Sequence, residues 1–364
     1  MAKIIKYRDE ARPRAGLIRV REFTMKDAYS FHTNDECLEA YYKRGHEAYE
    51  RIFKRVGMKD FLSIKADAGM MGGSVSHEFM AISEVGEDTI FVNPDRSYLA
   101  NREIATTSLK FVKEDELALE KVSTPDTESI EDVAKFLGVE TSQTAKAVLY
   151  QSADYDELIF VLVRGDIEVN ETKLKNFLKT ADLYPASDEA IKAIGAFPGY
   201  ASAAGIATEG VKLVVDPSVA ESSNLVAGGN EKDLHVKNYN HTRDAAFQGD
   251  IVDIATVRTG DPCPITGEAL EELRGIEIGN IFQLGNKYTS SMGVKYLDQT
   301  GKAQVPTMGC YGIGVGRTMA SVLEQNCDKF GPVWPLAIAP YQVHIVALNP
   351  KKENIKEIAD ELYA

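Results

Sequence analysis

The sequence predicts an α+β fold in which one domain interrupts another. Two β-prone runs at residues 4–7 and 17–23 flank a loop rich in Arg, Pro and Gly, which indicates an antiparallel hairpin. Near the other end of the chain, alternating glycines at 309–316 precede a helix. Between these features, after the Pro-containing linker 122–128, short helices and strands alternate over a stretch long enough for a core of its own. The intervening unit therefore looks inserted.

Length and composition indicate a globular chain with more than one domain. The 364 residues are 44% hydrophobic and 26% charged, and the formal net charge is −14. This acidity argues against a protein that grips nucleic acid with its whole surface, but it allows a local basic patch. Because no apolar run reaches the length of a membrane helix and the N-terminus is polar, we expect a cytoplasmic location and no membrane partner. The four cysteines form no C-x-x-C pair, which is typical of reduced thiols.

The regular elements can be placed from periodicity and from start and stop signals. Residues 33–36 read as a capping box, and apolar residues follow at helical spacing until Gly57. Residues 130–137 form a short helix, Asn170 begins another, and 351–363 is amphipathic. Expected strands lie at 145–151, 158–164, 211–216, 275–285 and 342–347.

Arginine side chains concentrate on the N-terminal hairpin. Guanidinium groups form a planar, permanently charged clamp for phosphates and carboxylates, and Phe23 can offer a flat face to a purine. A solvated basic loop is the competing interpretation, which the joint pattern Arg-x-Glu and Arg-x-x-x-Phe-x-x-x-Asp disfavours. The residues of this pattern and the neighbouring arginines are Arg8, Glu10, Arg12, Arg14, Arg19, Arg21, Phe23 and Asp27.

Two glycine-rich segments indicate pocket walls. A bend at 69–73 leads into a strand with the adjacent pair His77 and Glu78, and glycines allow close backbone approach. A satisfied structural histidine is the competing interpretation of His77. The G-x-G-x-G run that ends before Arg317 lacks the G-x-G-x-x-G spacing of a dinucleotide fold, so a nicotinamide-dependent oxidoreductase is a weak alternative.

The hairpin and the second glycine run resemble motifs 2 and 3 of class II aminoacyl-tRNA synthetases. The sequence of residues 12–31 is very similar to the corresponding segment of bacterial prolyl-tRNA synthetases. This resemblance implies a class II antiparallel sheet flanked by helices, with ATP and Mg²⁺ as cofactors and with proline and tRNA(Pro) as substrates. It also implies domain limits: catalytic domain 1–122 and 241–338, inserted mixed α/β editing domain 123–240, and the start of the anticodon-binding domain at 339–364.

The resemblance implies a role for individual residues in adenylate formation. Arg8 would hold the α-phosphate and the proline carboxylate, Glu10 would contact the adenine side, and Mg²⁺ would bridge the phosphates. Phe23 and Arg317 would sandwich the base. The proline carboxylate is already ionised, so catalysis needs positioning and charge neutralisation rather than a general base. Further candidates are Arg19 for catalysis, Gly314 and Gly316 for ATP, and His77, Glu78, Phe282 and Gln283 for proline; Asn280, Asn286 and Thr289 depart from the family's residues and receive no role.

The inserted unit is similar to the editing domain of these synthetases and to free-standing deacylases that hydrolyse mischarged tRNA. Alanine is smaller than proline and cannot be excluded sterically, and a missing methylene is worth only ~1–3 kcal/mol, so a second, hydrolytic site is the expected remedy. The family's G-x-x-x-P loop reads Gly199 to Ala203 here, which bears on the pocket shape. The competing interpretations are that Lys146 is an exposed lysine on a strand and that His235 is a surface histidine. The implied editing residues are Lys146, Gly199, Asp216 and His235.

The resemblance covers the middle of the family's polypeptide. Nothing before Lys6 corresponds to motif 1, which forms most of the class II dimer interface, and most of the anticodon-binding domain has no counterpart. We therefore expect a fragment. The family is homodimeric, but the resemblance does not decide whether this chain forms a dimer. A catalytically silent fragment that only binds ATP, amino acid or tRNA is the competing function.

Overall fold

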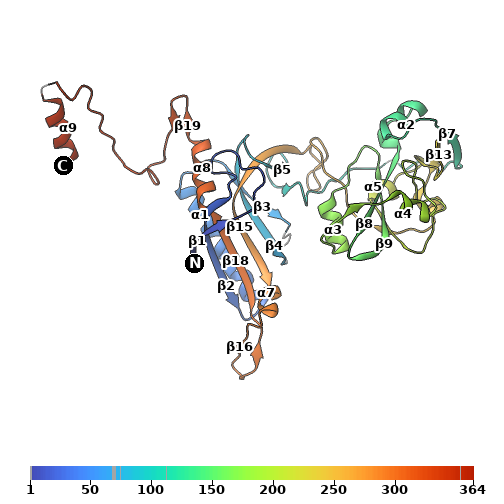
Figure 1. Ribbon diagram of the computed structural model, residues 1–364, viewed down its shortest axis with the longest axis horizontal. Helices are drawn as coiled ribbons and strands as arrows, with labels where there is room; N and C mark the ends of the chain where they lie inside the picture. Colours follow the sequence, from blue (N-terminus) through green and yellow to red (C-terminus); the bar gives the residue numbers. More distant parts are fainter. Residues whose placement is uncertain (1, 68–70, 74, 112, 353) are drawn as a thin grey trace. The chain divides into compact units, whose positions relative to one another are not determined.

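The computed structural model describes residues 2–67, 71–73, 75–111, 113–352 and 354–364, which divide into two compact units (Figure 1). The first unit comprises Met1–Asp88 and Arg274–Ala364, and the second comprises Thr89–Leu273. The chain thus leaves the first unit, forms the second and returns, as the predicted α+β fold with an insertion requires. The compact second unit is wider than the predicted limits 123 and 240, because Phe91 and Ala100 pack with Val257 and Leu270.

The first unit is built on an antiparallel sheet, as predicted. Its strands succeed one another in space in the order β1 (Ala2–Tyr7), β2 (Glu22–His32), β18 (Thr307–Gly314), β15 (Glu271–Gly285), β4 (Val75–Ile82) and β3 (Phe61–Ala66). Neighbours in this order come from distant parts of the sequence. The hairpin and the second glycine run therefore meet, because β2 and β18 are adjacent.

The N-terminal hairpin forms, but its second strand starts later than predicted. β2 begins at Glu22 rather than at 17, and Arg14 and Arg19 form only an isolated bridge. Ala15 and Gly16 have positive φ angles of 53° and 60°, which reverse the chain before Ile18. Ile18 is then buried with the core instead of extending the strand.

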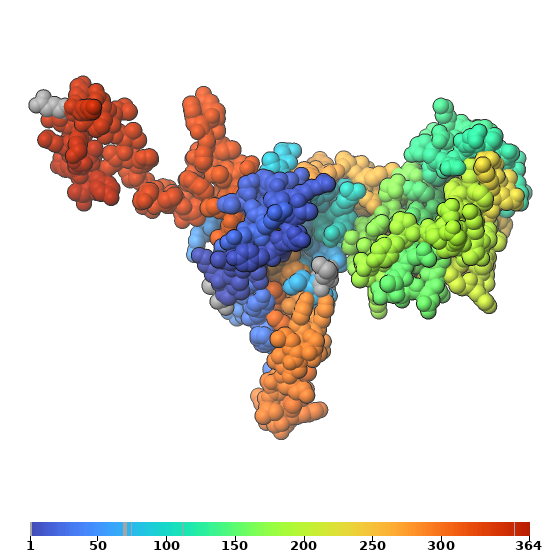
Figure 2. All heavy atoms as spheres, in the orientation of Figure 1, coloured from blue at the N-terminus to red at the C-terminus, as the bar shows by residue number. Residues whose placement is uncertain are grey.

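The longest helix of the first unit packs on the sheet. α1 (Asp35–Arg55) buries Leu38, Tyr42, Tyr49 and Phe53. The predicted capping box is corrected by one residue, because the Asn34 side chain, not Thr33, accepts the hydrogen bond from Cys37 N at 2.8 Å. The remaining elements are α7 (Lys287–Ser291), α8 (Val315–Gln325), α9 (Ile355–Tyr363) and the short strands β16 (Tyr296–Leu297), β17 (Ala303–Gln304), β19 (Cys327–Asp328) and β20 (Gly331–Pro332). The hairpin of β16 and β17 is the narrow orange projection in Figure 2.

Of the strand and the helix predicted near the C-terminus, only the helix is confirmed. The strand predicted at 342–347 is wrong: these residues form no strand, and Tyr341 and Val343 are exposed. A β-prone run stays irregular when no neighbouring strand satisfies its backbone. The amphipathic helix exists but begins at Ile355 rather than 351. No helix within the described ranges is both long and apolar enough to span a membrane.

The second unit contains a mixed sheet between two hydrophobic clusters. Neighbouring residues of β9 alternate between them, with Phe160 and Leu162 on one side and Val161 and Val163 on the other. Such a strand, buried on both faces, is typical of parallel pairing, which β9 makes with β11. The sheet order is β10 (Tyr184–Pro185), β8 (Ala145–Ser152), β9 (Tyr155–Arg164), β11 (Val211–Val215) and β14 (Asp250–Ile251).

The predicted helices and strands of this unit are confirmed. α2 (Ile130–Leu137) ends at Gly138 with φ 68°, and Asn170 caps α3 (Glu171–Leu178) by accepting a hydrogen bond from Lys173 N. The unit also contains β5 (Asp88–Val92), β6 (Leu99–Asn101), β7 (Glu120–Ser123), β12 (Leu225–Gly228), β13 (Leu234–Tyr239), the 3₁₀ turn Thr141–Gln143, α4 (Asp188–Ala193), α5 (Pro217–Ala220) and α6 (His241–Asp244). β12, β13 and β7 form a separate antiparallel sheet.

Candidate functional site

A hollow in the first unit, here called the arginine pocket, is lined by the arginine-rich hairpin and by the glycine-rich run before α8. The hairpin supplies one wall, and β15, β18 and the start of α8 supply the others. All the residues predicted for catalysis and ATP binding line it. The lining includes Arg8, Glu10, Arg19, Phe23, Met25, Glu277, Asn280, Gly312, Gly314, Gly316 and Arg317.

The charges of the hairpin are organised by two carboxylates. Arg19 lies 2.9 Å from Glu10 and 3.0 Å from Glu87, which also binds Arg14 at 2.6 Å. The hydrogen bond from Arg19 holds the pKa of Glu10 below its usual value. Arg8 differs: its guanidinium lies 5.1 Å from the centre of the Phe23 ring, and in the described part of the chain it has no ion-pair partner. Among the arginines that line the pocket, Arg8 is thus the one left available for an anionic ligand.

Arg317 joins three walls of the arginine pocket. Its Nε donates to the Ile18 carbonyl at 2.9 Å, and its Nη1 donates to the Glu277 carbonyl at 2.9 Å and lies 3.4 Å from the Glu277 carboxylate. The guanidinium is therefore fixed in position before any ligand arrives. The loop between β1 and β2 and the middle of β15 are held by the same side chain.

The predicted proline-binding residues do not line the arginine pocket, and they divide between two faces of the sheet. His77 faces α1, where its Nδ1 lies 2.7 Å from the Tyr42 hydroxyl, and burial lowers its pKa to about 4. Adjacent strand residues point to opposite faces, so Glu78 lies on the other face, in register with Asn280. Phe282 shares that face, and the bend predicted at 69–73 lies partly outside the described residues. The position of His77 is that of a satisfied structural histidine.

A second hollow, in the inserted unit, is here called the lysine pocket. It has a volume of about 350 Å³ and lies among α2, β8, β12, β13 and the loop at 198–201. Lys146, Gly199 and His235 line it together, as predicted for editing residues. The competing interpretations are wrong, because the Lys146 side chain is 19% exposed and His235 is 6% exposed.

The polar side chains of the lysine pocket each contact a neighbouring residue. The Lys146 Nζ lies 2.7 Å from a carboxylate oxygen of Glu168, and the His235 Nδ1 lies 2.6 Å from the Thr124 hydroxyl. Burial lowers the pKa of His235, so its ring is neutral near pH 7. Gly199 has φ 81°, a conformation that L side chains rarely adopt, and this turns the loop against Glu128.

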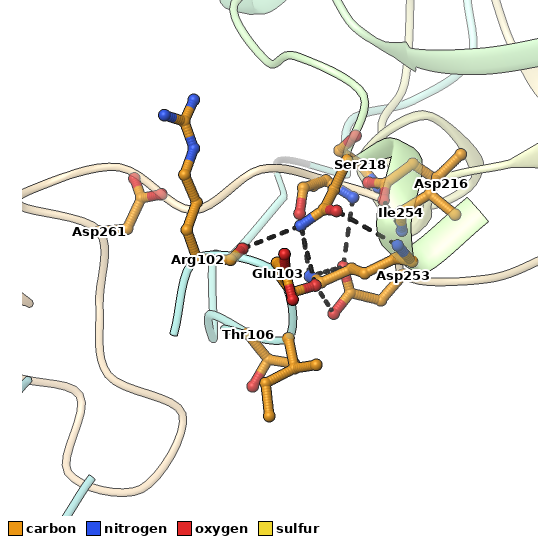
Figure 3. Close-up of polar contacts among 12 residues, drawn as sticks. Arg102, Glu103, Thr106, Asp216, Ser218, Asp253, Ile254 and Asp261 are labelled. Carbon is orange, nitrogen blue, oxygen red and sulfur yellow. Dashed lines mark hydrogen bonds and ion pairs between the residues drawn. The ribbon is translucent and has the colours of Figure 1, made fainter. Parts of the chain in front are cut away.

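Asp216 is not brought to the lysine pocket, unlike the other predicted editing residues. It is 3% exposed and caps α5, with one carboxylate oxygen accepting from Ser218 N at 2.9 Å and the other from Ile254 N at 3.0 Å (Figure 3). Burial raises its pKa. Its position is structural, since both oxygens are used to hold backbone. Its predicted editing role finds no support in this geometry.

Ala203 also lies away from the lysine pocket. It is fully buried in the hydrophobic cluster beneath the loop and does not line the hollow. The loop is held instead by Asn230, whose side chain binds Ser202 N at 2.8 Å and the Ala204 carbonyl at 2.6 Å. The departure from proline at this position therefore affects core packing rather than the pocket wall.

Known proteins match the chain in two ways. Residues 124–244 match the family model of the aminoacyl-tRNA editing domain. Proline–tRNA ligases of Fusobacterium nucleatum, Bacillus velezensis and Desulforamulus reducens are 48%, 45% and 47% identical to it, each over 98% of the chain. The chain resembles bacterial-type prolyl-tRNA synthetases along nearly its whole length. It spans 63% of the length of each of these relatives.

Two residues of the arginine pocket received no role from the sequence: Glu277 was not considered, and Asn280 was set aside. Glu277 contacts Arg317, and the Asn280 amide donates to the Glu277 carboxylate at 3.2 Å while its oxygen accepts from Ser76 at 3.3 Å. Strict alternation would place positions 277 and 280 on opposite faces. An irregularity in the pairing between Glu277 and Gly279 places both at the pocket, and the glycine at 279 was the available signal.

Proposed function

We propose that this chain carries the two activities of a bacterial proline–tRNA ligase. The first is ATP-dependent activation of proline to prolyl-adenylate and transfer to tRNA(Pro). The second is hydrolytic removal of alanine from mischarged tRNA(Pro). The observation that supports the proposal most directly is the convergence of residues from two distant motifs, Arg8, Phe23 and Arg317, on one pocket in a chain that aligns with such ligases at 44–48% identity. A cytoplasmic location follows from charging of tRNA.

In the arginine pocket the proposed chemistry is positioning and charge neutralisation. Phe23 and the fixed guanidinium of Arg317 offer two faces between which adenine can stack. Arg8, without an ion-pair partner in the described residues, is suited to the α-phosphate, where the proline carboxylate attacks and pyrophosphate leaves. Gly312 and Gly314 on β18 and Gly316 in the first turn of α8 keep this wall of the pocket free of side chains.

Mg²⁺ fits this pocket only as a companion of the nucleotide. The described residues contain no group of three or more His, Cys, Asp or Glu side chains that could hold a metal ion. Mg²⁺ is usually bound by one or two carboxylates together with substrate phosphates. Glu277 is the carboxylate that lines the pocket beside Arg317 and would supply that contact. The ion would neutralise phosphate charge.

For proline itself we propose Glu78 rather than His77 as the contact. Glu78 lies in register with Asn280, which lines the arginine pocket, so both side chains leave the same face of the sheet. A carboxylate there suits the secondary ammonium of proline. His77 supports the strand from behind through Tyr42.

In the lysine pocket the proposed reaction is ester hydrolysis. Water adds to the carbonyl of the alanyl ester, the bond to the ribose oxygen breaks, and alanine and tRNA are released. The walls are rich in small residues, which suit a methyl side chain better than a pyrrolidine ring; they include Ala145, Ala147, Gly199, Ala201 and Gly228. Lys146 supplies the positive charge.

Deacylation tests the editing activity. We expect the purified chain to hydrolyse alanyl-tRNA(Pro) at least ten-fold faster than prolyl-tRNA(Pro), because about that ratio follows from one or two methylenes in a close-fitting pocket. Proline-dependent exchange of pyrophosphate into ATP tests the activation step separately. A folded sample that cleaves neither ester and catalyses no exchange would support the silent-fragment alternative.

A further inference from the structure

The charge balance of the lysine pocket is unexpected for a site that receives the end of a nucleic acid. Lys146 is its one lining Lys or Arg among the described residues, whereas Glu128, Glu131 and Glu168 bring three carboxylates. His235 is neutral near pH 7. Lys146 is therefore the residue that has to bind any anionic group of the ligand. Its Nζ, however, already lies 2.7 Å from Oε1 of Glu168.

The two partners of this ion pair have very different surroundings. The Lys146 side chain is 19% exposed, because its stem lies in the wall of β8, whereas the Glu168 side chain is 79% exposed. An ion pair with one partner in solvent is weak, since water competes for the exposed charge. A ligand anion that enters the pocket can therefore replace Glu168 at small cost.

The backbone beneath Glu168 is firmly held, so only its side chain needs to move. Its carbonyl accepts a hydrogen bond from Thr256 N at 2.8 Å, and the next residue, Val169, forms a bridge with Ala255. Glu168 also lines another hollow of the same unit, distinct from the lysine pocket, together with Arg102 and Arg258. That hollow is also lined by Asp166, which contacts Arg258 at 3.2 Å, and by Glu272, so a displaced Glu168 carboxylate meets a polar surface of mixed charge.

We propose that Glu168 is a displaceable counter-ion of Lys146, which keeps the ammonium group in place in the empty pocket and yields it to a phosphate of an incoming RNA 3′ end. This inference rests on the proposed editing function, because it assumes that the pocket receives aminoacylated RNA. Glu168 acts here as a positioning residue that competes with the ligand. Its removal should tighten binding instead of weakening it.

A double-mutant cycle on RNA binding tests the inference. The probe is an RNA hairpin with the tRNA(Pro) acceptor stem and a non-hydrolysable 3′-alanylamide, titrated by fluorescence against the wild type, Glu168→Gln, Lys146→Ala and the double variant. We expect Glu168→Gln to lower Kd by about two- to five-fold, the range of an exposed ion pair. In the Lys146→Ala background the same change should leave Kd unaltered. Glu131→Gln removes another carboxylate of the pocket that does not contact Lys146, and it should change Kd by less than about 1.5-fold.

The outcomes separate this inference from the editing activity. An unchanged or weaker affinity in Glu168→Gln, an equal gain in the Lys146→Ala background, or no binding by any folded variant overturns the counter-ion role. If the cycle behaves as expected but the wild type hydrolyses no alanyl ester, the editing proposal fails and the counter-ion role stands. If the wild type hydrolyses the ester but the two residues are not coupled, the editing proposal stands and the counter-ion role fails.

Discussion

The two pockets of this molecule hold their positive charges in opposite ways. In the arginine pocket, Arg19 contacts two carboxylates, and Arg317 contacts two backbone carbonyls and a carboxylate. In the lysine pocket, a single lysine contacts one carboxylate that is 79% exposed. The first arrangement fixes charge in advance, and the second holds it loosely.

This difference matches the ligands proposed for the two pockets. A nucleotide brings several groups to one place, and the fixed guanidinium groups of Arg19 and Arg317 shape the pocket without reorganisation at the moment of reaction, while Arg8 is left to meet the phosphate. The end of an acylated RNA brings little charge to the hydrolytic centre, and small walls can select its side chain. We therefore expect the arginine pocket to lose function gradually when one cation is removed, and the lysine pocket to lose it abruptly.

The largest expected effect is that of Lys146→Ala on deacylation. Because no other lining Lys or Arg is present among the described residues, we expect the rate for alanyl-tRNA(Pro) to fall by about 10²–10³-fold, the usual cost of removing a group that stabilises developing charge. Single-turnover hydrolysis measures it. The matched control is Lys212→Ala, another strand lysine of the same unit that pairs with Asp250 outside the pocket. Equal losses in both variants would mean that Lys146 acts through folding.

A smaller effect is expected for Arg317→Ala on ATP binding. Other cations remain in the arginine pocket, so we expect Kd for ATP to rise by about 3- to 30-fold, which corresponds to the loss of one cation–π contact with the base. Equilibrium titration with ATP measures it, and the melting temperature reports any loss of the Ile18 and Glu277 contacts. Arg21→Ala is the control, because Arg21 binds the Glu10 carbonyl and does not line the pocket. If Arg21→Ala raises Kd for ATP as much as Arg317→Ala does, ATP binding does not depend specifically on Arg317.

Most of the fold could be predicted from the sequence, because the signals were local. Gly138 and Asn170 mark helix ends through their own backbone and side-chain preferences, and the apolar run at 158–164 is a strand wherever its partners lie. The failures needed non-local information. The run 342–347 has strand propensity but no partner strand in the described structure.

The candidate sites divide in the same way. Arg8, Phe23 and Arg317 belong to patterns that specify a pocket by their spacing, and the structure brings them together. Asp216 and Lys146 look equally important in the sequence, but only the three-dimensional arrangement shows that both oxygens of Asp216 hold backbone groups. The choice between His77 and Glu78 likewise depended on which face of the sheet α1 covers.

The smallest expected effect concerns two histidines, half-buried His77 in the first unit and buried His235 in the second. Burial lowers the pKa of His77 to about 4 and also lowers that of His235, whereas an unfolded histidine has a pKa of about 6.5. As the pH falls below 6.5, the unfolded state gains a proton that the folded state does not bind, so each histidine lowers stability with falling pH, and the decline from His77 levels off below pH 4. Hydrogen exchange of β4 and β13 between pH 7 and pH 4.5, corrected for intrinsic rates, would follow each unit separately. We expect His77→Gln to reduce the pH dependence of β4 alone and His235→Gln that of β13 alone, with His32 and His241, whose pKa values burial also lowers, still contributing in their own units. A variant that reduces both would show that the two units unfold together rather than independently.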